Sequence, residues 1–250
     1  MKNLLSFLPL LLFCTALAAQ TTAPDTNKVE IYKTNGGELI FSFADVDVGA
    51  ADVSNVLRFS GFFHVGQKWH FDFGNHFGLF TGYGIRNVGF ITEDDGIDIA
   101  AYEGMIEEGD EVRVKRRSYT LGVPVGLKLG NFERNAYAYG GAELELMFNY
   151  KEKLFIDGDK EEKFNEWFSD RTNLLAPSVY GGVQFPGGIN LQFKYYLLNF
   201  LNQDYTERVN GVNVQPYQNV DSRMFYLSIS LNFGNNQLFK QEDKPKQKRT

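Results

Sequence analysis

Apolar and polar side chains alternate with a period of two along most of this chain, which is the pattern of β-strands with one apolar face. The clearest stretch is 57–73, where most odd positions are apolar and most even positions are polar or glycine. A helix cannot keep this order, because its apolar positions recur every three or four residues. The alternation therefore predicts a chain built from strands.

The same test predicts eight strands, and the connections between them are long and short in strict turn. The strands are 38–44, 56–73, 77–92, 112–130, 135–155, 173–185, 189–202 and 223–233. The long connections are 45–55, 93–111, 156–172 and 203–222, and the short ones are 74–76, 131–134 and 186–188. Outer-membrane barrels have short periplasmic turns and long outside loops. We therefore expect an all-β, eight-stranded antiparallel up-and-down transmembrane β-barrel with both termini periplasmic.

The two faces of the predicted strands indicate which side meets lipid. One face is apolar and aromatic on nearly every strand, and in 135–155 it includes Phe148 and Tyr150. The other face carries glycines and charges, which suit the interior of a lipid-embedded barrel better than the core of a soluble one. Closure would then satisfy every backbone group in hydrocarbon. Segment 56–73 exceeds the roughly 9–11 residues that cross a bilayer, so we expect it to protrude or bend.

The beginning of the chain has the features of a secretory signal peptide. Lys2 is followed by a mostly apolar run from Leu4 to Ala19 that closes on small residues. Cys14, the only cysteine, lies inside this run, and the bulky Phe13 before it disfavours a lipoprotein. The expected divisions of the chain are a signal peptide at 1–19, a polar periplasmic leader at 20–37, the outer-membrane barrel at 38–233 and a basic, disordered periplasmic tail at 234–250.

Composition and charge support strands and disfavour some partners. The 250 residues fit one domain and include 25 Gly, 23 Phe and 13 Tyr, with few helix-forming runs. Without residues 1–19 the chain keeps 24 basic against 31 acidic side chains, a balance of −7 that disfavours nucleic acid as a partner. After the signal peptide at 1–19, no stretch approaches the roughly 18–20 uninterrupted apolar residues of a membrane helix.

Three stretches of the chain resemble a known family. Leu57-Arg58-Phe59-Ser60, the glycine-rich stretch Phe77–Phe90 and a final strand ending in Phe233 resemble the small outer-membrane β-barrel family of Bacteroidota (porin family, PorT-like). The resemblance covers about 38–233 and implies a barrel rather than a chemistry. It also implies an alternative role as an accessory of a secretion apparatus. Unlike many barrels, the chain continues for 17 residues after its last aromatic strand.

The inward face of the predicted barrel carries charged residues from most strands. Buried charges in a membrane protein are costly unless they are paired, and an eight-stranded lumen is just wide enough for side chains to fill it. We therefore expect an ion-pair network, with a narrow charged pore as the alternative. The residues of this lumen network or gate are Arg58, Arg86, Arg116, Lys128, Glu143, Glu145 and Lys194.

The connection 93–111 is rich in carboxylates and contains no Lys or Arg. One interpretation is a solvated acidic loop on the cell surface. The functional alternative is a loop that binds a divalent cation or a basic partner. The candidate cation-binding residues are Asp94, Asp95, Asp98, Glu107, Glu108 and Asp110. The connection 156–172 lacks the glycine and the closing acid of a calcium loop, and its Trp167 and Phe168 form either an adhesive tip or packing on the rim.

Candidate catalytic chemistry is weak in this sequence. The histidines are His64, His70 and His76, and the first two would lie roughly 20 Å apart on one strand, so no metal site is expected. Ser60 and His64 share the inward face, but four residues of regular strand separate them by about 14 Å. That distance excludes an unaided Ser-His dyad, and we expect no catalytic residue, cofactor or metal.

These observations favour a non-enzymatic outer-membrane β-barrel with a structural, surface-interaction or minor transport role. The alternatives are the secretion accessory that the resemblance implies and a lipid-modifying outer-membrane enzyme. The expected partners are outer-membrane lipid, lipopolysaccharide and the barrel-assembly machinery, without nucleic acid, and the expected state is a monomer.

Overall fold

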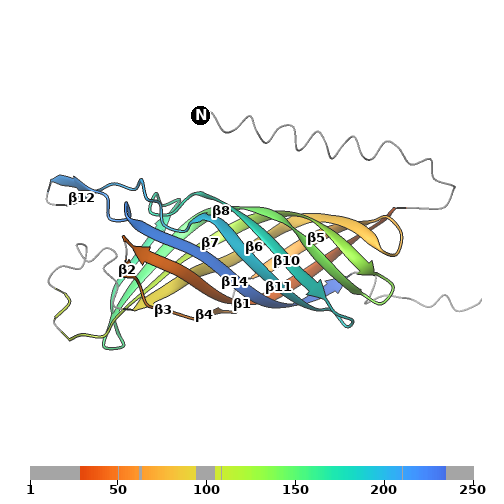
Figure 1. The fold of residues 1–250 in the computed structure, drawn as a ribbon, viewed down its shortest axis with the longest axis horizontal. Coiled ribbons are helices and arrows are strands. Elements are labelled where there is room, and N and C mark those ends of the chain that lie inside the picture. Colours follow the sequence, from red (N-terminus) through yellow and green to blue (C-terminus); the bar gives the residue numbers. More distant parts are fainter. Residues whose placement is uncertain are drawn as a thin grey trace, which may run out of the picture.

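The computed structural model describes residues 29–49, 51–61, 64–93, 105–107, 109–209 and 211–234. Eight strands form a closed antiparallel barrel in which each strand pairs with the next and the last pairs with the first (Figure 1). In ring order they are β1 (Glu30–Val48), β5 (Val65–Asp72), β6 (Phe77–Glu93), β7 (Val112–Asn131), β8 (Ala136–Ile156), β10 (Leu175–Gln184), β11 (Ile189–Asn199) and β14 (Val220–Gly234). The eight-stranded up-and-down barrel predicted from the alternation is confirmed. The described ranges contain no helix long and apolar enough to span a membrane.

The first strand begins earlier than the alternation indicates. β1 starts at Glu30, and its first residues pair with β5 from Glu30 opposite Asp72 to Gly37 opposite Val65. The same strand pairs with β14 on its other edge. Polar residues at outward positions, including Lys33, hide this segment from a search for apolar alternation. Residues 30–37 are nevertheless part of the barrel wall, because all of them pair with β5 and residues 34–37 also pair with β14.

The second predicted strand, 56–73, is divided in the structure into the end of β3 (Asn55–Val56), β4 (Arg58–Ser60) and β5. A further short segment, β2 (Ala51–Asp52), lies in the predicted connection 45–55. β2 and β4 pair with β1, whereas β3 pairs with β6. The pairing with β1 also shifts by two residues between these segments, because Ile40 is opposite Ser60 in β4 and Gly37 is opposite Val65 in β5.

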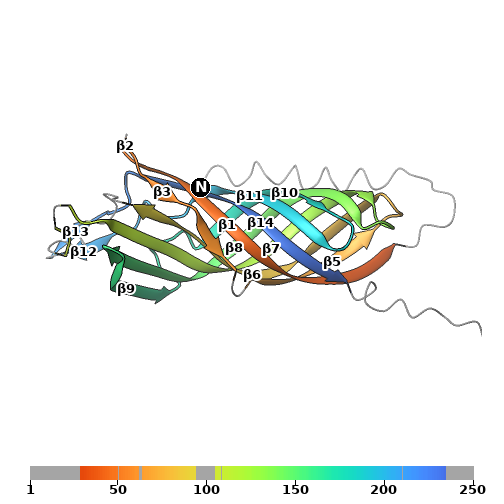
Figure 2. The ribbon, with the colours of Figure 1, turned by 90° about the horizontal axis from the view of Figure 1, so that it is seen from below.

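The longer connections gather at one end of the barrel and the short turns at the other (Figure 2). At the long-loop end, β8 turns at Asp157 and Gly158 into β9 (Asp159–Trp167), which pairs back onto it. Both turn residues have positive φ, 49° and 89°. Most of the connection predicted at 156–172 is thus a hairpin strand. A second hairpin, β12 (Glu207–Val209) and β13 (Val212–Val214), lies in the last long connection.

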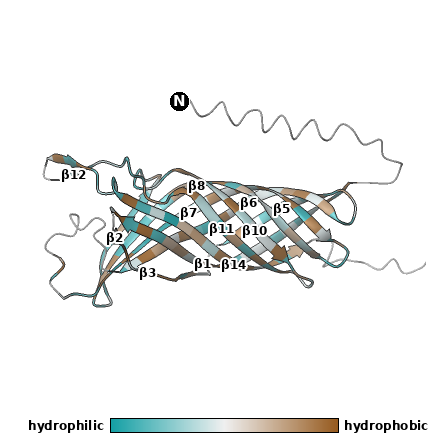
Figure 3. Ribbon diagram, viewed as in Figure 1, coloured by the Kyte–Doolittle hydropathy of each residue, from teal (hydrophilic) through white to brown (hydrophobic). Residues whose placement is uncertain are grey.

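Hydrophobic and polar residues alternate along the ring strands (Figure 3), and the burial pattern shows which face is outside. On the second half of β7 the outward positions are apolar and 39–63% exposed: Leu121, Val123, Val125, Leu127 and Leu129. The inward positions of the same strand are buried. The barrel thus has an apolar outer surface and a side-chain-filled lumen.

One part of the predicted outer face is wrong. Tyr150 is 1% exposed and lies inside the barrel. The cause is a β-bulge: Tyr119 pairs with Asn149 and Thr120 with Met147, so Phe148 is an extra residue in β8. An extra residue shifts every following side chain to the opposite face. Beyond Phe148, even-numbered residues of β8 therefore point inward.

Candidate functional site

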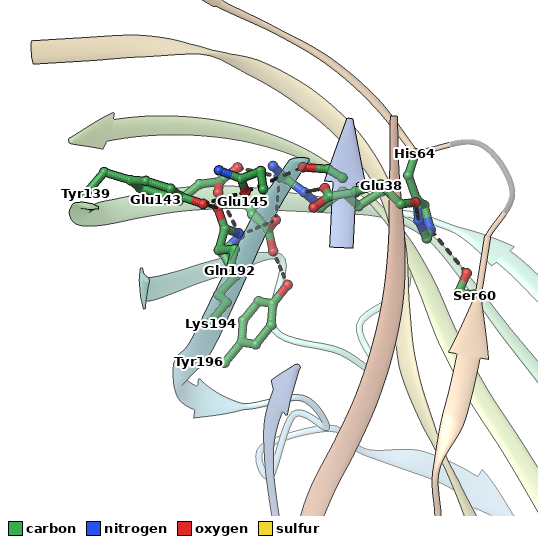
Figure 4. A network of polar contacts seen from close by, with 12 residues as sticks. Glu38, Ser60, His64, Tyr139, Glu143, Glu145, Gln192, Lys194 and Tyr196 are labelled. Atoms are coloured by element: carbon green, nitrogen blue, oxygen red, sulfur yellow. Dashed lines mark hydrogen bonds and ion pairs between the residues drawn. The ribbon is translucent and has the colours of Figure 1, made fainter. Parts of the chain in front are cut away.

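A cluster of paired charges fills the centre of the lumen. Glu143 and Glu145 on β8 face Lys194 on β11 (Figure 4), and Arg86 on β6 contacts the same two carboxylates. Arg86 Nη1 donates to Glu143 Oε1 at 2.5 Å and to Glu145 Oε1 at 3.1 Å. Lys194 Nζ donates to Glu143 Oε2 at 2.7 Å and to Glu145 Oε1 at 2.9 Å. All four side chains are buried, so each charge depends on its partners.

Other residues complete the central cluster. Glu38 on β1 accepts a hydrogen bond from Arg86 Nε, and the Tyr196 hydroxyl donates to Glu145 Oε2. Lys68 on β5 lines the same small cavity as Glu38 and Arg86, with its Nζ 5.5 Å from the centres of two aromatic rings. The cluster therefore combines three cationic side chains with three carboxylates. Its formal charge is balanced, which lowers the cost of burying it.

Two more ion pairs lie above and below this cluster along the barrel axis. Towards the short turns, Lys128 Nζ lies 2.8 Å from Asp72 Oδ1 and donates to the Tyr32 hydroxyl at 2.6 Å. Towards the long loops, Arg116 Nε donates to Glu152 Oε2 at 3.0 Å. The lumen thus contains charged layers at three levels, each with both signs present.

Aromatic and apolar layers separate the charged ones. On the short-turn side, Phe80, Tyr139 and Tyr180 form a buried cluster with ring centroids 5.8–6.2 Å apart. On the long-loop side, Phe90 and Phe200 meet edge to face at 5.4 Å within a larger buried cluster. This interior is less polar than the alternation suggested. Charged side chains and clusters of aromatic and apolar side chains thus fill the described part of the lumen.

The cavities that remain are consistent with a filled lumen. The space beside Glu38, Lys68 and Arg86 measures about 30 Å³, which is large enough to hold water but not a larger ligand. A larger space of about 270 Å³ opens among the short turns, beside Tyr32 and Tyr137. The larger one is a mouth of the barrel and does not reach through the charged centre.

The structure divides the predicted lumen residues among separate contacts. Arg86, Glu143, Glu145 and Lys194 meet in the central cluster, whereas Arg116 and Lys128 belong to the two outlying pairs. Among the described residues, Arg58 bonds to no carboxylate. Its guanidinium donates to the backbone oxygen of Asn87 at 3.2 Å and to the Asn87 side-chain oxygen at 2.6 Å. Arg58 therefore links two parts of the wall.

The predicted separation of Ser60 and His64 is wrong. Their Oγ and Nε2 atoms lie 3.1 Å apart (Figure 4), because β4 ends at Ser60 and no regular strand joins the two residues. His64 Nδ1 lies 2.9 Å from the backbone oxygen of Glu38, whose carboxylate is bonded to Arg86. The pair is buried, and a carbonyl oxygen occupies the place where a catalytic triad has a carboxylate.

The remaining histidines and acids do not converge. His70 Nε2 lies 2.9 Å from Thr34 Oγ1, and His76 Nδ1 lies 2.7 Å from the backbone oxygen of Gly130. Of the predicted acidic loop, Glu107 and Asp110 are described, and the Glu107 backbone N–H donates to Asp110 Oδ2 at 2.7 Å. The described part of the chain holds no group of three or more metal-ligating side chains. The other candidates lie outside the described residues: Asp94, Asp95, Asp98 and Glu108.

Sequence reasoning missed two members of the central cluster. Glu38 is the first residue of the predicted first strand. Because side chains alternate along a strand, Glu38 lies on the same face as the inward Ile40 and Ser42, and this periodicity could have identified it. Tyr196 lies where the alternation of 189–202 becomes irregular. In that stretch apolar residues occupy both faces, so parity alone could not orient the side chain.

By sequence, neither a protein-family model nor a curated protein matches this chain. Solved structures of similar shape include Ail of Yersinia pestis, determined with the heparin analogue sucrose octasulfate, at 10% identity and a TM-score of 0.37 over 81% of this chain and 99% of that one. Neisserial surface protein A is similar at 10% identity and a TM-score of 0.35, over 82% of this chain and 99% of that one. OprG from Pseudomonas aeruginosa is similar at 10% identity and a TM-score of 0.32, over 83% of this chain and 97% of that one. These likenesses are too distant to carry an argument about function.

Proposed function

We propose that this chain is a non-enzymatic outer-membrane protein whose sealed barrel anchors extracellular loops for contact with the cell's surroundings. One observation carries the proposal: the apolar side chains cover the outside of the barrel, while ion-paired charges lie inside. Val125 on β7 is 63% exposed and Phe193 on β11 is 49% exposed, yet Lys194 beside Phe193 is fully buried. Hydrocarbon accommodates this arrangement, whereas water opposes so large an apolar surface.

The spacing of exposed aromatic residues supports a membrane band. Tyr119 and Phe148 stack near the long-loop end with ring centroids 6.3 Å apart, and Phe73 and Phe77 stack near the short turns at 5.9 Å. Phe77 pairs with Leu129 of β7, ten residues along the strand from Tyr119. Ten residues span about 33 Å, which at a tilt near 40° is about 25 Å of height. That height equals the apolar band of an outer-membrane barrel.

The same geometry favours an anchor over a channel. β8 is 21 residues long, and Tyr119 at the edge of the apolar band is opposite Asn149, so the last third of β8 lies beyond the band at the long-loop end. This extension carries β9 away from the membrane. The layered lumen below it leaves no continuous path for ions. The short turns, the start of β1 and the end of β14 would then face the periplasm.

A heat-shift gel with membrane fractionation tests the placement. We expect the expressed chain to fractionate with the outer membrane, and the unheated protein to migrate differently from the heated one, as folded barrels do. Recovery of the folded chain from the soluble fraction without detergent would refute the proposal. Planar-bilayer recording tests the sealed lumen, and we expect no conductance steps.

A lipid hydrolase is a second candidate, favoured by the 3.1 Å contact between Ser60 and His64. A Ser60→Ala variant that abolishes a measurable lipid hydrolysis would support it, and unchanged lipids in both strains would remove it. The secretion-accessory role that the PorT-like resemblance implies is tested separately. A deletion strain that loses secreted cargo would favour that role over simple anchoring.

A further inference from the structure

A row of outward-facing basic residues, most of them half-buried, lies on β7, β8 and β9, just beyond the aromatic residues at the long-loop end. Lys115 of β7, Lys153 of β8 and Lys163 of β9 are directly opposite one another across the three strands. Arg117 and Lys151 form a second row, two residues closer to the membrane band. We call these five residues the basic surface.

The register makes the basic surface compact. Paired residues on neighbouring strands have Cα atoms about 4.5–5.5 Å apart, and successive outward residues are about 7 Å apart along a strand. The five positive charges therefore share an area on the order of 10 Å across. Like charges placed directly opposite one another destabilise a sheet. A chain with a surplus of acids could have separated them by placing Asp or Glu on the middle strand.

Carboxylates do not neutralise these charges among the described residues. No acidic side chain there lies within 4.0 Å of any of the five, although Arg113 on the same face of β7 pairs with Glu93 at 2.7 Å and Glu111 at 2.8 Å. Lys153 lies on the extension of β8, outside the apolar band. Its pKa is lowered first by desolvation and then by the positive charges around it. The basic surface thus lacks a counter-charge of its own.

The position of the basic surface along the barrel axis indicates what could supply the missing negative charge. The aromatic rings of Tyr119, Phe148 and Trp167 form a continuous outward row, with centroids 6.3 and 5.9 Å apart. In register, Arg117 and Lys151 come directly after this row, and Arg117 lies 5.6 Å above the Tyr119 ring. Aromatic rows of this kind mark the edge of the hydrocarbon. The basic surface therefore lies at the level of lipid headgroups.

We propose that the basic surface binds the phosphate groups of an anionic glycolipid in the leaflet that surrounds the long-loop end. The proposal rests on the outer-membrane placement proposed above and adds a specific lipid contact to it. Lys and Arg donate strong charge-assisted hydrogen bonds to phosphate oxygens. The apolar wall below would pack against the acyl chains of the same lipid, so charge and hydrophobic contact would act together.

Lipid binding to the folded chain in detergent micelles tests this proposal. The probes are diphosphorylated lipid A and the same lipid without its phosphates, measured by native mass spectrometry at physiological ionic strength. We expect the phosphorylated lipid to bind at least ten-fold more tightly. The triple variant Lys115→Gln/Lys153→Gln/Lys163→Gln should lose that preference, because each basic side chain near an anionic surface contributes roughly five-fold.

Two control variants keep the outcome interpretable. Arg113→Gln removes one charge from the same face of β7, but a charge already paired with acids, so we expect less than a two-fold change. The variant Lys115→Arg/Lys153→Arg/Lys163→Arg keeps the charge and should bind as the parent chain does. A heat shift on a gel shows that each variant is folded.

Several results would overturn the proposal. Equal binding of the two lipids by the parent chain would do so, as would undiminished preference in the triple glutamine variant. Tighter binding of soluble heparin than of phosphorylated lipid would assign the surface to a soluble polyanion instead. Each of these can occur in a chain that folds and fractionates with membranes. Failure of the lipid contact is therefore distinguishable from failure of the membrane placement.

Discussion

At the scale of single residues, the lumen depends on complete pairing of its charges. Glu145 and Lys194 are both fully buried, and each has partners of opposite charge. Taking such a charge out of water is costly, and the partners offset the cost only while the whole cluster is intact. The charged residues of the central cluster are therefore expected to tolerate single substitutions poorly.

Replacing Lys194 by Met tests this dependence. The change leaves Glu143 and Glu145 with one fewer cation, and we expect a loss of about 3–5 kcal/mol in the free energy of unfolding. Urea unfolding in lipid vesicles measures it. The double variant Lys194→Met/Glu143→Gln removes one charge of each sign and should regain much of the loss. An equal loss in the double variant would contradict the account of pairing.

Repulsion within the basic surface leads to a second prediction at this scale. Lys115 and Lys153 are directly opposite one another with no carboxylate between them among the described residues. In lipid-free detergent, Lys153→Gln should leave the thermal midpoint unchanged or raise it, because a like-charge pair is removed. A marked fall in that midpoint would mean that Lys153 has a stabilising structural contact instead.

Parity along the strands predicted which side chains point inward, but it did not predict their partners. Arg86, Glu143 and Lys194 were assigned to the lumen from the alternation alone. Their mutual contacts depend on the relative height of strands that are distant in sequence, which a one-dimensional pattern does not contain. Ser60 and His64 show the same limit, because the 14 Å estimate assumed one regular strand, whereas β4 ends at Ser60 and β5 begins at Val65.

At the scale of elements, irregular positions decide which residues face lipid. The bulge at Phe148 reverses the facing of the end of β8, so that Tyr150 enters the core and Lys151 faces outward. The alternation predicted β8 as a strand but not this reversal, since an extra residue leaves no mark in composition. The early start of β1 was missed because outward positions such as Lys33 and Asn35 are polar, so that no apolar alternation marks residues 30–37.

Deleting Phe148 tests the role of the bulge. Without the extra residue, Lys151 and Lys153 would turn towards the lumen and Tyr150 towards the outside. We expect the deletion variant to lose the heat shift that marks a folded barrel. The matched control, Phe148→Ala, keeps the extra backbone residue and should retain the shift. A folded deletion variant with native lipid binding would show that the bulge does not set the facing of β8.

The first residues of β1 allow a parallel test. Residues 30–37 supply the pairing partner of β5, so deleting them would leave that strand with one open edge in the membrane. We expect the deletion to abolish folding into vesicles. Changing Lys33 and Asn35 to Ala keeps the backbone and should be tolerated. Efficient folding of the deletion variant would show that the barrel closes without the pairing between residues 30–37 and β5.

At the scale of the whole molecule, we propose that the apolar outer surface of the barrel faces lipid and that the charged lumen is sealed. The alternating loop lengths and the facing of the strands predicted the barrel as a whole, because both follow from local sequence. A lumen filled by paired charges was also expected, but its aromatic layers were not. Contacts such as Phe90 against Phe200 form only after closure of the barrel.

The most direct measurement is the environment of single spin labels in lipid vesicles. In a Cys14→Ser background, which removes the only native cysteine, labels are placed at Val125 on the outer face and at Ser178 in the lumen. We predict that the Val125 label is exposed to oxygen dissolved in hydrocarbon and shielded from a water-soluble relaxation agent, while the Ser178 label is shielded from both. A Val125 label reached by the water-soluble agent, with Ser178 in contact with lipid, would contradict the account.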